Sequence, residues 1–175
     1  TGDFIGNTDN FYGGAIYNKG TIGNITGDFI GNSSSDEDGG AICNSNNSAI
    51  GNIIGDFIRN TADLAGGAIS NVNNSTIGNI TGDFIGNDSG THGGAIENYN
   101  STIGNITGDF IGNNTNYVGG AIYNFYDTIG DITGDFIGND TAYKGGAICN
   151  HYGTIGDITG DFIGNTDNFY GGAIY

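Results

Sequence analysis

Seven aspartates at nearly constant spacing are the residues best placed to do chemistry in this sequence. Each lies in a Gly-Asp-Phe triplet, at Asp3, Asp28, Asp56, Asp83, Asp109, Asp135 and Asp161. One interpretation is Ca²⁺ bound between neighbouring copies, since carboxylates are hard oxygen ligands. Its best candidates are Asp131, Asp135, Asp157 and Asp161, because Asp131 and Asp157 replace asparagine near the triplet. The nonapeptide calcium repeat G-G-x-G-x-D is absent. We therefore favour turn residues that accept hydrogen bonds from backbone N–H groups, and expect no cofactor.

Other groups that act in catalysis are few. His92 and His151 lie in different variable segments without a partner motif, and we interpret both as surface turn residues. Catalysis by carboxylates needs a pair with separated pKa values, whereas here the same aspartate recurs in every copy. Cys43 and Cys149 are too few for a disulfide framework. The sequence predicts no enzyme and no catalytic residue.

The charge balance excludes two classes of partner. The 175 residues include 19 Asp and Glu against three Lys and Arg, which gives a net charge of −16. Such a chain repels phosphate backbones and anionic lipids. No stretch approaches the roughly 20 apolar residues of a membrane helix. We expect no nucleic acid partner and no membrane span in this segment.

Two motifs repeat in phase along the whole chain. Gly-Asp-Phe returns after 25, 28, 27, 26, 26 and 26 residues. Gly-Gly-Ala-Ile occurs equally often, beginning at Gly13, Gly39, Gly66, Gly93, Gly119, Gly145 and Gly171. Two short variable segments in each unit, the first after G-G-A-I-x-N and the second after F-I-G-N, take up all the length variation, which is typical of surface turns. The sequence predicts a single repeat array over residues 1–175, as a window of a longer chain.

The constant stretches favour strands over helices. They hold glycine every few residues together with many β-branched residues, and the chain has 36 Gly and no Pro. Collagen is excluded because glycine does not recur at every third position. Only a parallel stack places identical residues above one another at this period, with rungs ~4.8 Å apart. We predict an all-β, right-handed parallel β-helix (β-solenoid) with about 26 residues and three short strands per coil, and nearly seven coils.

Alternation along the strands predicts which residues form the core. A phenylalanine ladder is expected inside, at Phe4, Phe29, Phe57, Phe84, Phe110, Phe136 and Phe162. The residue after Gly-Gly-Ala-Ile is expected to face outward, because one copy holds Glu97. Strict alternation leaves the isoleucine after each ladder phenylalanine, such as Ile30, outside. Either the chain bends and buries both residues, which we favour, or these isoleucines form a lateral contact surface.

Asparagines form two further ladders, which we interpret as structural. One consists of Asn7, Asn32, Asn60, Asn87, Asn113, Asn139 and Asn165. The other consists of Asn18, Asn44, Asn71, Asn98, Asn124 and Asn150. Stacked amides hydrogen-bond to one another along the stacking axis, and asparagine suits turns.

The pairing of F-I-G-N with G-G-A-I, as at residues 84–87 and 93–96, resembles a known repeat. It is similar to the FxxN and GGA(I/L/V) repeats of polymorphic outer-membrane proteins, of related autotransporter passengers, and of adhesin-like proteins of bacteria and archaea. The resemblance covers the whole chain. It implies an extracellular or cell-surface β-helical stalk or adhesin, with Phe inward and Asn at the turn, and it supplies no catalytic residue.

The sequence therefore predicts a structural extracellular β-solenoid that forms a surface fibre or adhesin stalk. The alternative is an adhesin module that recognises a host glycan or protein through its variable turns, among which residues 33–38 are the outlier. Uniform coils favour the first. Residues 1–17 and 159–175 are identical, and neither end carries a capping pattern. We expect self-association, by continuation of the chain or by end-to-end stacking, with lateral association as a further option.

Overall fold

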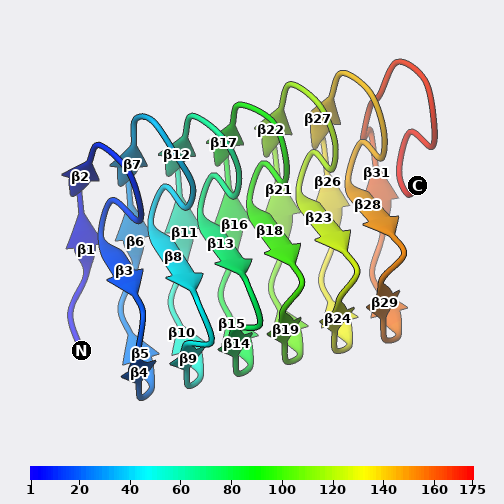
Figure 1. Cartoon of the computed structure of the whole chain (residues 1–175). Helices are drawn as coiled ribbons and strands as arrows, with labels where there is room; N and C mark the ends of the chain where they lie inside the picture. The colour runs from blue at the N-terminus through cyan, green and yellow to red at the C-terminus, as the bar shows by residue number, and fades with distance from the viewer.

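Every strand of this chain pairs in parallel with the equivalent strand one coil away. The computed structural model describes residues 1–175 and contains 31 strands of two to four residues. It has no helix that is long and apolar enough to cross a membrane. Successive coils lie side by side from the N-terminus to the C-terminus (Figure 1), and Phe57 pairs in register with Phe29 and Phe84. The predicted parallel β-solenoid with about 26 residues per coil is confirmed.

Five sheets run along the solenoid. The Phe sheet contains β1 (Phe4–Ile5), β6 (Phe29–Ile30), β11 (Phe57–Ile58), β16 (Phe84–Ile85), β21 (Phe110–Ile111), β26 (Phe136–Ile137) and β31 (Phe162–Ile163). The Ile-Thr sheet contains β5 (Ile25–Thr26), β10 (Ile53–Ile54), β15 (Ile80–Thr81), β20 (Ile106–Thr107), β25 (Ile132–Thr133) and β30 (Ile158–Thr159). The Thr-Ile sheet contains β4 (Thr21–Ile22), β9 (Ala49–Ile50), β14 (Thr76–Ile77), β19 (Thr102–Ile103), β24 (Thr128–Ile129) and β29 (Thr154–Ile155).

Of the remaining two sheets, the gap sheet is formed by the start of the second variable segment and the GGAI sheet follows that segment. The GGAI sheet contains β3 (Ile16–Asn18), β8 (Ile42–Ser45), β13 (Ile69–Val72), β18 (Ile96–Tyr99), β23 (Ile122–Phe125) and β28 (Ile148–His151). The gap sheet contains β2 (Thr8–Asp9), β7 (Ser33–Ser34), β12 (Thr61–Ala62), β17 (Asp88–Ser89), β22 (Asn114–Thr115) and β27 (Asp140–Thr141).

The number of strands per coil differs from the prediction of three. The predicted strand Thr-Ile-Gly-Asn-Ile is divided into two short strands. The strand Phe29–Ile30 is bounded by Gly27 and Gly31, which have φ of +141° and +61°. These angles are costly for residues with a side chain, so glycine breaks the extended backbone there. The second variable segment also begins with a strand, because Ser33 N–H donates to the Asn7 carbonyl at 2.9 Å and so continues the ladder.

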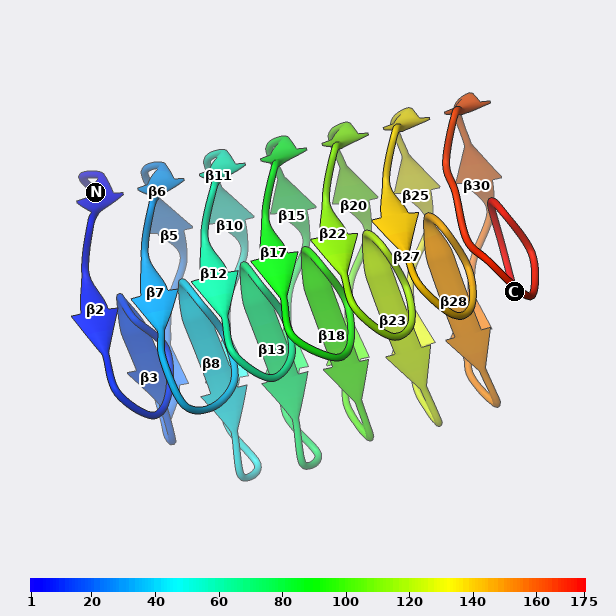
Figure 2. The ribbon, with the colours of Figure 1, turned by 90° about the horizontal axis from the view of Figure 1, so that it is seen from above.

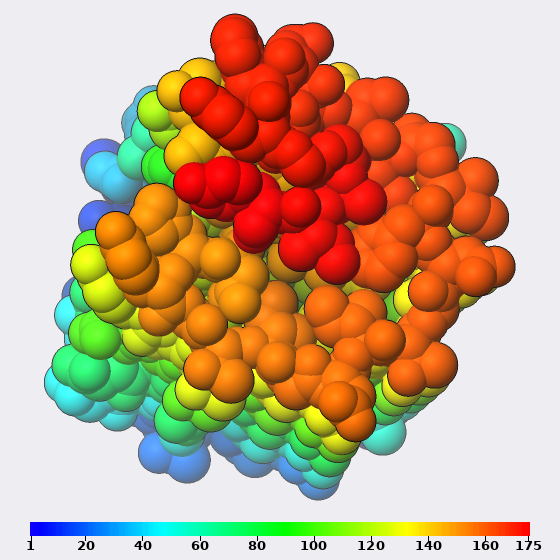
Figure 3. Space-filling model, turned by 90° about the vertical axis from the view of Figure 1, so that its right-hand side faces the viewer, coloured from blue at the N-terminus to red at the C-terminus, as the bar shows by residue number.

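The core is a single column of apolar side chains between the sheets. It holds 24 buried residues, among them Phe29, Phe57, Phe84, Phe110 and Phe136, each with no exposed surface. Neighbouring ladder rings from Phe4 to Phe162 stack with centroids 4.5–4.8 Å apart and planes 1–4° from parallel. Figure 3, which views the solenoid from its C-terminal side, shows side chains of successive coils aligned in rows.

The isoleucine after each ladder phenylalanine remains at the surface. The favoured bend that buries both residues was wrong: Ile30 is half-buried and Ile5 is 63% exposed, whereas Phe29 has no exposed surface. Side chains of adjacent residues in a strand point to opposite faces, and two-residue strands such as β6 keep that alternation. These isoleucines, at positions 5, 30, 58, 85, 111, 137 and 163, form the isoleucine stripe.

The residue after Gly-Gly-Ala-Ile points away from the core, but it is not solvent-exposed in the middle coils. Cys43, Ser70, Glu97 and Cys149 are all buried. The loops of the second variable segment lie over the GGAI strands (Figure 2), and the ring of His92 stacks on that of Tyr123 at 4.9 Å. The predicted outward direction of this position is therefore confirmed, and loop side chains cover it.

Candidate ligand-binding groove

The aspartate ladder is committed to hydrogen bonds with the backbone. From Asp3 to Asp135, Oδ1 of each aspartate accepts the N–H of the equivalent aspartate in the next coil at 2.8–3.1 Å. A parallel ladder formed by Asn24, Asn52, Asn79, Asn105, Asp131 and Asp157 makes the same bond at 2.9–3.0 Å. Replacing asparagine by aspartate keeps this acceptor, which explains why both occur there.

The calcium candidates lie in these two ladders. Asp131 accepts the N–H of Asp157, and Asp135 accepts the N–H of Asp161. No group of three or more His, Cys, Asp or Glu side chains in the chain could hold a metal ion. The structure therefore places Asp131, Asp135, Asp157 and Asp161 on neighbouring rungs without gathering them into a coordination shell.

The two asparagine ladders are continuous chains of amide hydrogen bonds. In the ladder from Asn7 to Asn165, each Nδ2 donates to the next Oδ1 at 2.8–3.0 Å. From Asn32 onward, Nδ2 also donates to a ladder phenylalanine carbonyl at 2.7–2.9 Å. The ladder from Asn18 to Asn150 makes the amide–amide bond at 2.8–2.9 Å. Buried amides need such partners, so both ladders fix the register.

Glu97 is a buried acid under the second variable segment. Its side chain is 7% exposed, and its Oε2 accepts a hydrogen bond from the Ser70 hydroxyl at 2.9 Å. Burial, together with the negative charge of Asp38, raises the pKa of Glu97 to about 8. Cys43 and Cys149 occupy the same outer face four coils apart, and both are free thiols. Burial raises the pKa of Cys149 to about 11.

An aromatic groove of about 190 Å³ lies on the same side, toward the C-terminus. It is lined by His92, Tyr117, Val118, Tyr123, Phe125, Tyr143, Lys144, Cys149 and His151. Both histidines therefore face one groove, although they lie two coils apart and were interpreted as independent surface residues. Burial lowers the pKa of His92. Sequence reasoning missed this groove, and the only available signal was the run of aromatic residues in the later variable segments.

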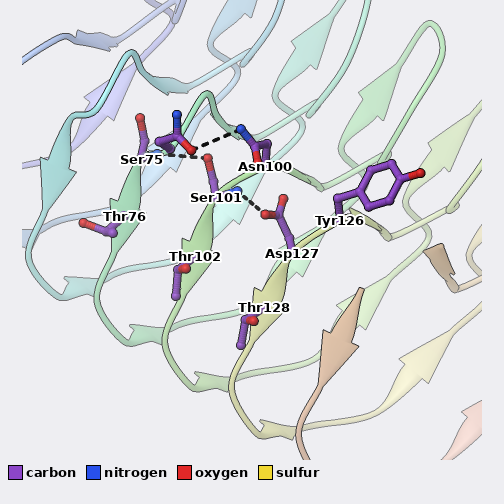
Figure 4. A pocket seen from close by; sticks show the side chains of 9 residues that line it. Ser75, Thr76, Asn100, Ser101, Thr102, Tyr126, Asp127 and Thr128 are labelled. Carbon is purple, nitrogen blue, oxygen red and sulfur yellow. Dashed lines mark hydrogen bonds between the residues drawn. The ribbon is translucent and has the colours of Figure 1, made fainter. Parts of the chain in front are cut away.

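A second, polar groove of about 350 Å³ lies on the first variable segment, between the GGAI sheet and the Thr-Ile sheet. It spans three successive coils and is lined by Asn74, Ser75, Thr76, Asn100, Ser101, Thr102, Tyr126, Asp127 and Thr128. Figure 4 shows the side chains of Thr76, Thr102 and Thr128 in a row below those of Ser75, Ser101 and Asp127. Hydroxyl, amide and carboxyl groups thus converge on one surface depression.

Asp127 departs from the pattern of this groove. Equivalent positions in earlier coils hold serine: Ser75 Oγ accepts the N–H of Ser48 at 3.2 Å, and Ser101 Oγ accepts the N–H of Ser75 at 3.0 Å. In the next coil Asp127 Oδ1 accepts the N–H of Ser101 (Figure 4). Its second oxygen, Oδ2, is buried and has no hydrogen-bond partner, and the side chain is 8% exposed. Burial raises the pKa of Asp127 to about 6.

Comparison with known proteins gives one family match. Residues 26–45 match the model of the Chlamydia polymorphic membrane protein repeat. This stretch contains F-I-G-N at residues 29–32 and G-G-A-I at residues 39–42, the paired motif that recurs in the other coils. Searches of curated proteins and of solved structures return no significant match.

Proposed function

We propose that this chain belongs to a surface-exposed, adhesin-like repeat protein in which the β-solenoid forms a stalk. The observation that carries the proposal is the match to the polymorphic membrane protein repeat at residues 26–45. The paired motif within that match supplies the buried Phe29 and Ile42, and its equivalents supply the same core positions along the solenoid. The proposal assigns no catalytic residue.

The continuous ladders provide the rigidity that a stalk requires. One column of stacked rings and two columns of amide hydrogen bonds run through successive coils without interruption. Each coil contacts only its neighbours, so stability accumulates coil by coil along such an array. The variable turns, which project between these columns, are the parts that a partner would meet.

Self-association is part of this proposal. Equivalent rungs pair in parallel register, so a further coil of the same sequence would extend all five sheets. That coil would come from a longer chain or from a second copy stacked end to end. The isoleucine stripe offers an apolar surface for lateral association between fibres.

Immunogold electron microscopy of intact source cells tests the proposal. Antibodies are raised against residues 33–38 of the second variable segment, in which Ser35 and Asp36 are exposed. The proposal predicts gold particles on thin fibres or projections at the surface of unpermeabilised cells. Labelling that requires permeabilisation would refute a surface location.

A further inference from the structure

The polar groove at Asp127 has the chemistry of a binding site. Asp127 Oδ2 is an acceptor that the protein itself leaves without a partner, within a side chain that is more than nine-tenths buried. Buried polar groups are nearly always hydrogen-bonded, so this unpartnered oxygen is an exception that needs an explanation. In the preceding coils, Ser75 and Ser101 at the same position leave no such oxygen.

The lining indicates the kind of molecule that carries the donor. All nine lining residues have hydroxyl, amide or carboxyl groups, and one of them, Tyr126, is also aromatic. Hydroxyls and amides both donate and accept, and they recur on three rungs, which suits a ligand bearing several hydroxyl groups. The volume of about 350 Å³ lies in the range of small-molecule sites.

Tyr126 adds an apolar surface at one end of the groove. It occupies the position that Asn74 and Asn100 hold in the preceding coils, and its side chain is 58% exposed. Its ring extends beyond Asp127 toward the next coil (Figure 4) and stacks on Tyr152 at 5.0 Å. An aromatic face of this kind packs against the C–H face of a sugar ring while polar groups bind its hydroxyls.

Charge argues against the other small ligands. An anion would meet a carboxylate on a chain of net charge −16. A Ca²⁺ ion takes six to eight oxygen ligands with several carboxylates among them, whereas Asp127 is the one carboxylate of this groove.

We propose that the groove between the GGAI and Thr-Ile sheets binds a short neutral oligosaccharide, one hydroxyl of which donates to Asp127 Oδ2. The inference rests on the proposed function, because it gives the stalk the ligand class of an adhesin. Ser101 N–H holds the carboxylate in place through Oδ1, and Tyr126 borders the sugar at the C-terminal end of the groove.

The test uses the purified chain with neutral trisaccharides of glucose, mannose and N-acetylglucosamine as probes. Saturation-transfer NMR measures binding, and chemical-shift changes at Thr76, Thr102 and Thr128 locate it. We expect at least one trisaccharide to bind with a dissociation constant of about 1 mM or below. Asp127→Ser, which restores the serine of the preceding coils, should weaken binding at least about tenfold, a loss of about 1.4 kcal/mol.

Three further variants make the result specific. Asp127→Asn keeps an acceptor for the Ser101 N–H but replaces an oxygen by an amide, and it should also lose binding. Tyr126→Asn, which introduces the residue of Asn74 and Asn100, should weaken it. Asp131→Asn removes the same charge outside the groove and restores the residue of Asn105, so binding should be unchanged.

Several outcomes would overturn the inference. One is the absence of trisaccharide binding up to about 10 mM, and another is binding by Asp127→Ser that is as tight as that of the natural chain. A third is chemical-shift changes at the groove residues on addition of calcium chloride or of the cationic peptide trilysine, but of no saccharide. Because this experiment uses the purified chain, its failure leaves the immunogold test of surface location untouched, and the reverse also holds.

Discussion

Replacing Glu97 by glutamine should flatten the pH dependence of stability. The folded chain holds the Glu97 proton up to about pH 8, whereas an exposed glutamate releases it near its ordinary pKa of 4.5. Folding therefore takes up a proton between these values, and the free energy of unfolding falls as pH rises through that window. The slope from this one group approaches about 1.4 kcal/mol per pH unit. Over the whole window the loss is on the order of 5 kcal/mol.

Glutamine has nearly the shape of the protonated acid and retains an oxygen to accept the Ser70 hydroxyl bond. The variant cannot ionise, so its stability relative to the natural chain should increase steadily between about pH 5 and about pH 8. Urea unfolding followed by far-UV circular dichroism at several pH values measures the two curves. Asp38 and Asp127, whose pKa values burial also raises, remain in both proteins, so the difference reports Glu97 together with its charge interactions with these two groups.

Ser70→Ala provides a second perturbation of the same group. The Ser70 hydrogen bond lowers the pKa of Glu97, so its removal should extend the pH window of declining stability upward. Parallel curves for the natural chain and Glu97→Gln would refute the reasoning, because Glu97 would then ionise in the folded chain as it does in water.

Phe84→Ala should lower the free energy of unfolding by about 3–5 kcal/mol in urea titrations, because it opens a cavity between Phe57 and Phe110; a loss below about 1 kcal/mol would contradict a packed ring column. Asn87→Asp should destabilise by at least about 1–3 kcal/mol, because an oxygen replaces the Nδ2 that donates to Asn113 Oδ1 and to the Phe57 carbonyl. The matched Asn79→Asp should be tolerated, since only its Oδ1 accepts a ladder bond; equal losses in both variants would refute these roles. Chelators should leave the melting temperature unchanged, since the Asp135 carboxylate already accepts a hydrogen bond from the Asp161 backbone N–H; a drop of many degrees in a calorimetric scan would show a structural metal.

The sequence predicts those features of the fold that repeat. Gly-Asp-Phe returns at a nearly fixed interval, and a parallel stack is the arrangement that places Phe57 between Phe29 and Phe84. The repeat interval and the composition do not specify the backbone angles within a coil. The short strand at Phe29 is bounded by positive φ at Gly27 and Gly31, and a continuous strand with the same glycines would have the same sequence pattern.

Contacts made by the variable segments were beyond sequence reasoning for a different reason. Glu97 indicates an exposed position when only its own strand is considered, yet the loops over the GGAI sheet bury it. The polar groove depends on one coil that differs from its neighbours, where Asp127 replaces a serine and Tyr126 an asparagine. Periodicity identifies what the coils share, so a site made by a departure from the repeat becomes visible only when the coils are stacked.

Distances between paired spin labels along the Ile-Thr sheet test the central claim, that each repeat of about 26 residues advances the chain by one rung. Both buried cysteines are first replaced by serine, and exposed Thr26 is labelled together with Thr107, Thr133 or Thr159 after substitution to cysteine. Pairing through β5, β10, β15, β20, β25 and β30 places these partners three, four and five rungs from Thr26. Pulsed electron–electron double resonance should therefore give label separations that rise linearly by about 4.8 Å per repeat. Separations that rise by much more than one rung per repeat, or that do not rise in order, would contradict the parallel solenoid.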